Sequence, residues 1–210
     1  MKVNEIFYSI QGEIDVGKPT IFIRLQGCNM EPKCIFCDSS YSWNEGKEMS
    51  NDEIYREIKP YLEKCQYIVF TGGEPMIQSD DITKLVLFLD EKRNDICCGL
   101  ETNGTIYNQD IFMFNNISVS PKKQMIDLDV LNQFNQNNVR FKFVYDKDLW
   151  FEKVIKDLDL EPWQVWIMAE GMTKQEQEEK IEGVVEYCKE KGYNFTLRLH
   201  TLTWGNKRAK

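Results

Sequence analysis

Short apolar runs alternate with longer stretches of helical periodicity along this 210-residue chain, and this alternation limits its possible folds more than any other feature. The clearest runs, rich in β-branched and aromatic residues, lie at residues 67–70, 96–101, 117–120, 139–145 and 164–170. Repeated β-α units imply parallel strands joined by right-handed crossovers. About six such units are too few for a closed eight-stranded barrel. We therefore expect an α/β fold, a partial TIM-like barrel of about six parallel β-α units, forming a single domain over residues 1–210.

Two capping-box patterns predict where helices begin. Ser50 and Glu53 open one helix, and Thr173 and Glu176 open another that ends near Gly192. Further helices are expected after residues 79–80, near 127–137 and near 148–158. The last segment with strand character, 194–200 (NFTLRLH), is predicted to be the final strand.

Polar and glycine-rich segments follow the predicted strands. They read GCN, TGGEP, ETNGT, SPK and AEG, beginning at residues 27, 71, 101, 120 and 169. In parallel α/β folds, the residues that follow the carboxyl ends of the strands line one shared opening. The sequence therefore predicts that these segments meet at a single site.

Three of the seven cysteines, Cys28, Cys34 and Cys37, form a C-x5-C-x2-C pattern. Structural zinc is closed by four Cys or His ligands, and the chain has only one histidine, His200, near its far end. An odd cysteine count, and an N-terminal segment without an apolar signal-peptide region, argue against a disulfide-bonded secreted protein. The other cysteines, at positions 65, 97, 98 and 188, lie in apolar segments and need no ligand role.

The overall charge excludes one class of partner. The net charge is -8 and the sequence pI is about 4.9, so no diffuse basic surface is available for nucleic acid. No run approaches the roughly 18 apolar residues that a membrane span needs. We expect a protein of the reducing cytoplasm that binds neither nucleic acid nor membrane.

Three thiolates suit an iron-sulfur cluster that keeps one iron open. A four-iron cluster takes one protein ligand per iron, and thiolates are its usual ligands. Three cysteines leave the fourth iron free to bind a small chelating ligand, and S-adenosylmethionine (SAM) offers an amino and a carboxylate group for that purpose. The cluster can then transfer one electron to the sulfonium and release a deoxyadenosyl radical.

The cysteine pattern with Phe36 before its last cysteine, followed by GGEP at residues 72–75, resembles the radical SAM superfamily. Further segments resemble the 7-carboxy-7-deazaguanine synthases, namely those at residues 7–13, 22–29, 34–43, 101–105, 120–122 and 199–208. The resemblance implies a single radical SAM domain over residues 1–210. It is weakest between residues 124 and 162.

The resemblance also implies a reaction. Members of the family are lyases that convert 6-carboxy-5,6,7,8-tetrahydropterin into 7-carboxy-7-deazaguanine, with ring contraction and loss of ammonia, on the route to queuosine. The implied cofactors are a [4Fe-4S] cluster, catalytic SAM and Mg²⁺. The implied partners are the pterin substrate, a flavodoxin- or ferredoxin-type reductant and a second copy of the chain in a homodimer.

The resemblance assigns roles to residues on the cluster and SAM side. Cys28, Cys34 and Cys37 match the cluster ligands, and Ser39 matches the hydroxyl that binds Mg²⁺, a hard ion that prefers oxygen ligands. The residues implied to contact SAM are Phe36, Cys37, Asp38, Gly72, Gly73, Glu74, Glu101, Asn103, Ser120, Pro121, Lys122 and Met168.

A second set is implied to contact the substrate. Arg24 would bind its carboxylate through a planar guanidinium, and Glu13, also counted as a catalytic residue, would accept hydrogen bonds from the guanidine-like edge of the pterin. The remaining residues of this set are Ile10, Gln11, Gly12, Thr71 and His200.

The chain departs from the common pattern in three places. The first two cysteines are separated by five residues where three are common in the superfamily, which indicates an insertion near residues 30–33. Ile14 stands where glycine is usual. Ala169 stands where many relatives have another residue, which leaves the adenine contacts near residues 168–171 undefined.

Two other functions remain open at this point. A glycyl-radical enzyme activase would share the small size and the GGEP segment, although the segments at residues 7–13 and 199–208 favour a small-molecule substrate. A structural zinc module could use the CxxC pair at Cys34 and Cys37.

Overall fold

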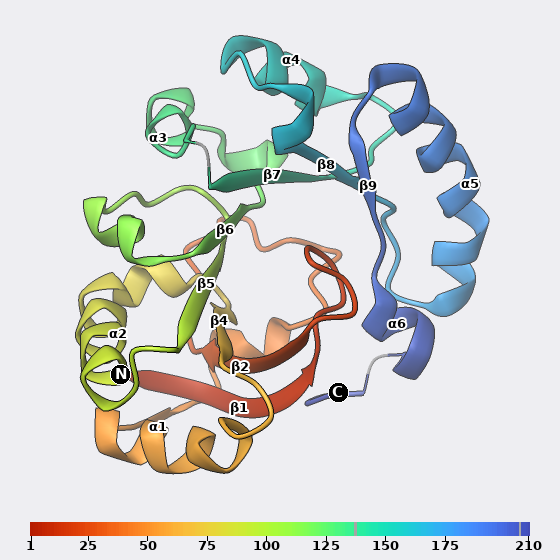
Figure 1. Cartoon of the computed structure of the whole chain (residues 1–210). Coiled ribbons are helices and arrows are strands. Elements are labelled where there is room, and N and C mark those ends of the chain that lie inside the picture. Colours follow the sequence, from red (N-terminus) through yellow and green to blue (C-terminus); the bar gives the residue numbers. More distant parts are fainter. Residues whose placement is uncertain (137, 206) are drawn as a thin grey trace.

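The strands form one open, curved sheet. A computed structural model describes residues 1–136, 138–205 and 207–210 (Figure 1). Within these residues one nine-stranded sheet has the order β3-β1-β2-β4-β5-β6-β7-β8-β9. The strands are β1 (Lys2–Ile10), β2 (Pro19–Leu25), β3 (Lys47–Glu48), β4 (Tyr67–Gly72), β5 (Cys97–Thr102), β6 (Asn116–Val119), β7 (Val139–Val144), β8 (Val165–Met168) and β9 (Asn194–Thr196).

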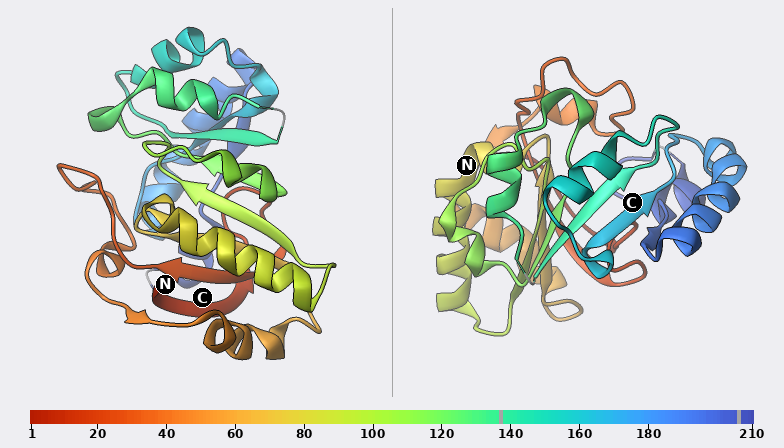
Figure 2. Two further views of the ribbon diagram at one scale, coloured as in Figure 1. Left: turned by 90° about the vertical axis from the view of Figure 1, so that its left-hand side faces the viewer. Right: turned by 90° about the horizontal axis from the view of Figure 1, so that it is seen from above.

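Helices cover the outer face of this sheet. The two views of Figure 2, like Figure 1, show the helices as a layer outside the curve of strands. The α-helices are α1 (Asn51–Ile58), α2 (Ser79–Lys92), α3 (Leu128–Gln133), α4 (Trp150–Asp157), α5 (Lys174–Lys191) and α6 (Leu199–Trp204). None of the helices in these ranges combines the length and the apolar character that a bilayer span requires.

The predicted fold class is confirmed. From β2 through β9, apart from β3, each strand pairs in parallel with its neighbour, and the sheet does not close on itself. Two further strands that the sequence pattern does not predict, β1 and β3, pair antiparallel at one edge. Both predicted capping boxes are present, at Ser50 with Glu53 and at Thr173 with Glu176.

Two predicted elements are shorter than expected. The helix expected near residues 127–137 is α3, with Asp127 as its N-cap. The strand expected at 194–200 ends at Thr196, so His200 lies in α6. The backbone turns away from β8 because the Leu199 N–H donates to the Gly12 carbonyl at 2.8 Å, a contact that local alternation cannot reveal.

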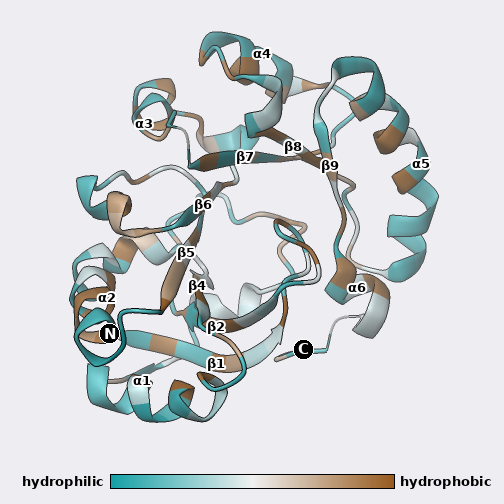
Figure 3. Cartoon of the chain, viewed as in Figure 1, coloured by the Kyte–Doolittle hydropathy of each residue, from teal (hydrophilic) through white to brown (hydrophobic). Residues whose placement is uncertain are grey.

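The core lies between the strands and the helices. Along β7, Val139, Phe141 and Phe143 are completely buried, and the ring of Phe143 stacks on Phe151 of α4 with centroids 5.6 Å apart. Figure 3 shows the same division between core and surface, because β8 inside the fold is coloured as hydrophobic and most of the outer helix α1 as hydrophilic. The opposite face of β7 carries Arg140 and Lys142. Alternate residues of this strand therefore face the hydrophobic core and the concave inner side of the sheet.

The loop between β1 and β2, residues 11–18, crosses the opening of the sheet (Figure 1). Its Asp15 Oδ1 accepts a 2.6 Å hydrogen bond from Arg140 Nη1 of β7, and the Glu13 carbonyl accepts one from the hydroxyl of Thr196 in β9. We call these residues the bridging loop, because they join the first strands of the chain to the last ones.

Truncating Phe143 to alanine should lower the free energy of unfolding by about 3–5 kcal/mol, since it removes a completely buried ring. Phe112 is 68% exposed and serves as the matched control, for which we expect a change within about 0.5 kcal/mol. Denaturant unfolding followed by circular dichroism measures both. Equal effects in the two variants would contradict the assignment of Phe143 to the core.

Candidate active site

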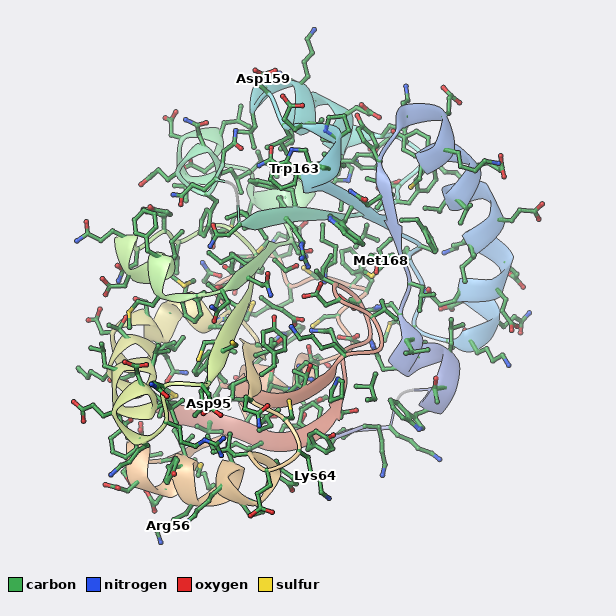
Figure 4. The ribbon with its side chains drawn as sticks, in the orientation of Figure 1. Arg56, Lys64, Asp95, Asp159, Trp163 and Met168 are labelled. Atoms are coloured by element: carbon green, nitrogen blue, oxygen red, sulfur yellow. The ribbon has the colours of Figure 1, made fainter. Side chains whose placement is uncertain are left out.

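A cavity of about 260 Å³ opens where the parallel strands end. The segments after β2, β4, β5, β6 and β8 all contribute to its wall, which confirms the prediction that they meet at one site. Met168, at the end of β8, lies on the inner side of the curved sheet in Figure 4, whereas Arg56 and Lys64 lie at the outer edge of the molecule.

Cys28, Cys34 and Cys37 are free, partly exposed and lie on the cavity wall. In the part of the chain that the structure describes, the three sulfur atoms of these cysteines do not all lie within 4.8 Å of one another. A single tetrahedral zinc would draw its sulfur ligands, each about 2.3 Å from the metal, closer together than that. Three free thiols on one cavity wall are the ligands that an iron-sulfur cluster uses.

We call residues 27–38, which carry Cys28, Cys34 and Cys37, the cysteine loop. The spacer between its first two cysteines, residues 29–33, folds back on the rest of this loop. Met30 is buried, the ammonium of Lys33 donates to the Cys28 carbonyl at 2.7 Å, and the amide of Gln124 donates to Cys34 Sγ at 3.4 Å. The five spacer residues are thus held by contacts from both sides.

Gly73 lies directly against the cysteine loop. A Cβ atom added to Gly73 would lie 1.8 Å from the Gly27 carbonyl oxygen and 3.0 Å from Cys28 Cβ. The next residue, Glu74, donates its N–H to the same Gly27 oxygen at 2.7 Å. Only glycine fits here, and the absence of a side chain lets the GGEP backbone contact the loop that carries the cysteines.

Glu74 itself faces the protein and not the cavity. Its carboxylate accepts hydrogen bonds from the Met76 N–H (3.0 Å), the Thr102 hydroxyl (2.7 Å) and the Asn103 N–H (2.6 Å). Burial raises the pKa of Glu74, and these hydrogen bonds oppose the rise. Glu74 and Pro121 are the predicted site residues that do not line the cavity.

A group of charged side chains forms one wall. Glu13 accepts hydrogen bonds from Lys142 Nζ and, at 3.3 Å, from Arg198 Nε. Arg198 Nη2 also donates to Asp38 Oδ2 at 2.6 Å, and His200 Nε2 lies 3.7 Å from the same oxygen. Burial would raise the pKa of Glu13, but Lys142, Arg198 and His200 lower it to about 2, so its carboxylate is ionised at neutral pH.

Glu13, Asp38 and His200 have the composition of a small metal site, with ligand atoms within 4.8 Å of one another. Both carboxylates, however, already accept hydrogen bonds from Arg198. The guanidinium occupies the position that a cation would take, and it lowers the pKa of Asp38 against the opposing effect of burial.

A second polar group involves Glu101. Its carboxylate accepts hydrogen bonds from the amide of Gln11 at 3.1 Å and from the hydroxyl of Thr71 at 2.7 Å. Glu101, predicted to contact SAM, is thus hydrogen-bonded to two residues predicted to contact the substrate. Asn103, also predicted to contact SAM, donates to Asn29 of the cysteine loop at 2.9 Å.

Arg24 reaches the cavity from β2. Its Nε donates to Glu5 Oε1 at 2.8 Å. In the described part of the chain its two Nη groups have no hydrogen-bond partner. Its two terminal NH2 groups, with four N–H donors in one plane, therefore remain available to an anionic ligand.

Lys122 is half-buried on the cavity wall beside the cysteine loop. It donates to the hydroxyl and the carbonyl of Ser120 at 2.6 and 2.8 Å. Burial and the nearby charge of Lys142 lower the pKa of Lys122 to about 8. The remaining predicted residues on the cavity wall are Ile10, Gly12, Phe36, Ser39 and Gly72.

Two residues of the charged wall, Lys142 and Arg198, are not among the predicted site residues. Each is a charged residue within an apolar alternating segment, VRFKFVY and NFTLRLH. In VRFKFVY the charges of Arg140 and Lys142 stand at alternate positions, which indicates a polar face on that strand, whereas Arg198 is a single charge just beyond the end of β9.

The chain resembles one family throughout its length. A family model described as the radical SAM superfamily matches residues 22–128. Proteins named 7-carboxy-7-deazaguanine synthase from Halobacterium salinarum and Aquifex aeolicus are 30% and 31% identical, covering 98% and 90% of this chain and 91% and 86% of the relatives. The crystal structure of QueE from Escherichia coli shares the fold, with a TM-score of 0.75 at 22% identity over 95% of this chain and 94% of that one.

Replacing Gly73 with alanine should destabilise the protein by about 1–3 kcal/mol, because the added methyl group would clash with the Gly27 carbonyl. The matched control is Gly183→Ala in α5, where an added Cβ meets nothing within 4 Å and helix propensity favours alanine by about 1 kcal/mol. The free energies of unfolding of both variants test this. A Gly73→Ala protein as stable as the Gly183→Ala protein would show that the contact is loose.

Proposed function

Because the chain belongs to the radical SAM superfamily and, within it, to the 7-carboxy-7-deazaguanine synthases, we propose that it converts 6-carboxy-5,6,7,8-tetrahydropterin into 7-carboxy-7-deazaguanine and ammonia. Substrate and product differ by one molecule of ammonia, so the reaction needs no net oxidant or reductant. The observation that carries the proposal is that Cys28, Cys34 and Cys37 share one cavity with the charged wall around Glu13.

The residues present fit the cofactors of this superfamily. Three free thiols can hold three irons of a [4Fe-4S] cluster and leave the fourth for SAM. When bound, the cluster and SAM supply the radical that removes a hydrogen atom from the substrate. The contact between Gly73 and the cysteine loop supports a role for this backbone in SAM binding.

We assign the SAM side of the cavity to residues near the cysteines and at the ends of β5, β6 and β8. These are Phe36, Asp38, Asn103, Ser120, Lys122 and Met168, all on the cavity wall. Glu74 has an indirect role in this assignment, since its buried carboxylate fixes the segment that follows Gly73 to the loop after β5.

The substrate side contains one group that can bind an anion, Arg24, and one group that is itself an anion, Glu13. The free Nη donors of Arg24 would bind the pterin carboxylate as a planar pair. The ionised carboxylate of Glu13 would accept hydrogen bonds from the N–H groups at the guanidine-like edge. Gln11, Thr71 and Glu101 form a neutral and acidic surface between them that can orient the ring.

We further propose that Ser39 is a ligand of Mg²⁺. Its hydroxyl lies on the cavity wall, 3.9 Å from Cys37 Sγ. Mg²⁺ prefers oxygen ligands and retains several waters, so one hydroxyl and substrate oxygens suffice. Family membership alone supports the proposals that a flavodoxin- or ferredoxin-type protein is the reductant, that the enzyme is a homodimer, and that residues 1–210 are one radical SAM domain.

Anaerobically reconstituted protein should convert the carboxytetrahydropterin into 7-carboxy-7-deazaguanine in the presence of SAM and a chemical reductant, as measured by liquid chromatography and mass spectrometry. The Cys37→Ala variant should make no product and bind less iron. Deoxyadenosine without any deazaguanine from the wild type would contradict the proposed substrate and reopen the activase hypothesis.

Changing Ser39 to alanine should reduce the stimulation by Mg²⁺ about tenfold or more, within the range observed on losing a group that orients a metal. Ser39→Thr retains a hydroxyl and should behave as the wild type does. Ser40→Ala removes a neighbouring exposed hydroxyl that is outside the cavity and should have no effect. Undiminished Mg²⁺ stimulation in Ser39→Ala, measured as initial rates with and without the ion, would exclude Ser39 as a ligand.

A further inference from the structure

Arg198 connects three separate segments of the cavity wall. It lies between β9 and α6 and is 8% exposed. Its Nε donates to Glu13 at 3.3 Å, its Nη2 to Asp38 at 2.6 Å, and its Nη1 to the Gly171 carbonyl at 3.0 Å. One guanidinium therefore contacts the bridging loop, the cysteine loop at Asp38, and the loop after β8.

We propose that Arg198 is a positioning residue that fixes the substrate side of the cavity relative to the SAM side. This inference rests on the proposed function, in which Glu13 contacts the pterin while Asp38 and the loop near Gly171 contact SAM. No other residue in the described ranges donates hydrogen bonds to both Glu13 and Asp38.

The geometry of the guanidinium explains why arginine suits this position. Its N–H donors lie in one rigid plane, so acceptors bound along different edges keep a fixed separation. A lysine ammonium is a single point charge on a flexible stem and cannot hold the same three acceptors in one plane.

Charge makes the same group necessary. The carboxylate oxygens of Glu13 and Asp38 lie within 4.8 Å of each other, and like charges at this distance repel. Lys142 pairs with Glu13 and His200 faces Asp38, but of the residues that the structure describes only Arg198 bonds to both carboxylates. Without Arg198, the bridging loop and the cysteine loop would separate.

A change in this separation should affect chemistry more than folding. Hydrogen-atom transfer requires the substrate to contact the reactive carbon derived from SAM, and a misplacement of about 1 Å can cost about 100-fold in rate. When transfer fails, dithionite still supplies the electron that cleaves SAM, and the deoxyadenosyl radical takes its hydrogen atom from a C–H bond of a buffer component, so deoxyadenosine accumulates. The diagnostic quantity is thus the ratio of deoxyadenosine to deazaguanine.

Arg140 provides a matched control. It also pairs with the bridging loop, through a 2.6 Å contact from Nη1 to Asp15 Oδ1, and it projects from β7 on the same face as Lys142. It does not line the main cavity. Loosening the bridging loop by itself would affect Arg140→Gln and Arg198→Gln alike.

The experiment compares Arg198→Gln, Arg198→Lys and Arg140→Gln with the wild type as reconstituted enzymes, using dithionite, SAM and the carboxytetrahydropterin. We expect Arg198→Gln to raise the deoxyadenosine-to-deazaguanine ratio about 10- to 100-fold, Arg198→Lys to raise it less, and Arg140→Gln to leave it unchanged. The electron paramagnetic resonance spectrum of the reduced cluster with saturating SAM should be the same in all four proteins.

The outcomes separate the two proposals. A wild type that forms deazaguanine, with an unchanged ratio in Arg198→Gln or an equal rise in Arg140→Gln, overturns the positioning role and leaves the proposed function standing. A wild type that forms no deazaguanine overturns both. If Arg198→Gln does not fold, as judged by its thermal unfolding, Arg198→Lys decides, and a wild-type ratio there overturns the role.

Discussion

The cavity depends on the closure of an open sheet by the bridging loop. The sheet has two free edges, and its strands alone would leave the space inside the curve open on one side. The Leu199 N–H to Gly12 carbonyl bond, the Thr196 contact to Glu13 and the Arg140 pair with Asp15 fasten residues 11–18 to β7, β9 and α6. These contacts join positions more than a hundred residues apart, so the charged wall is complete only when both ends of the chain have folded together.

The same closure places charges where water is scarce. Glu13, Lys142 and Arg198 are each largely removed from solvent, and isolated buried charges are costly. Pairing offsets that cost without adding much stability, since a buried ion pair gains little over apolar packing. Stability comes instead from the other face of the strands, where Phe141 and Phe143 pack against the helices. Alternation along β7 thus separates the residues that fold the protein from those that serve its site.

Features encoded by local pattern could be predicted, and features set by distant contacts could not. The cysteine spacing, both capping boxes and the meeting of the strand-end segments follow from neighbouring residues and from the rules of parallel sheets. The inward orientation of Glu74 depends on Thr102 and Asn103, and the turn that puts His200 in a helix depends on Gly12. Lys142 lies between these cases. The alternating pattern of its strand predicts which face the side chain is on, but it does not predict the distant partner Glu13.

The contacts that fix the start of the cysteine loop do not involve its spacer. The start of the loop is fixed at Gly27, whose N–H donates to the Ser42 carbonyl at 2.9 Å and whose oxygen accepts from Glu74 at 2.7 Å. Neither contact involves residues 29–33. Asn29 is hydrogen-bonded to Asn103, and only residues 30–33 form a separate projection, in which Met30 is buried and Lys33 donates to the Cys28 carbonyl. Added residues therefore lengthen the projection without moving Gly27 or Gly73, and the three thiols can keep their place on the cavity wall.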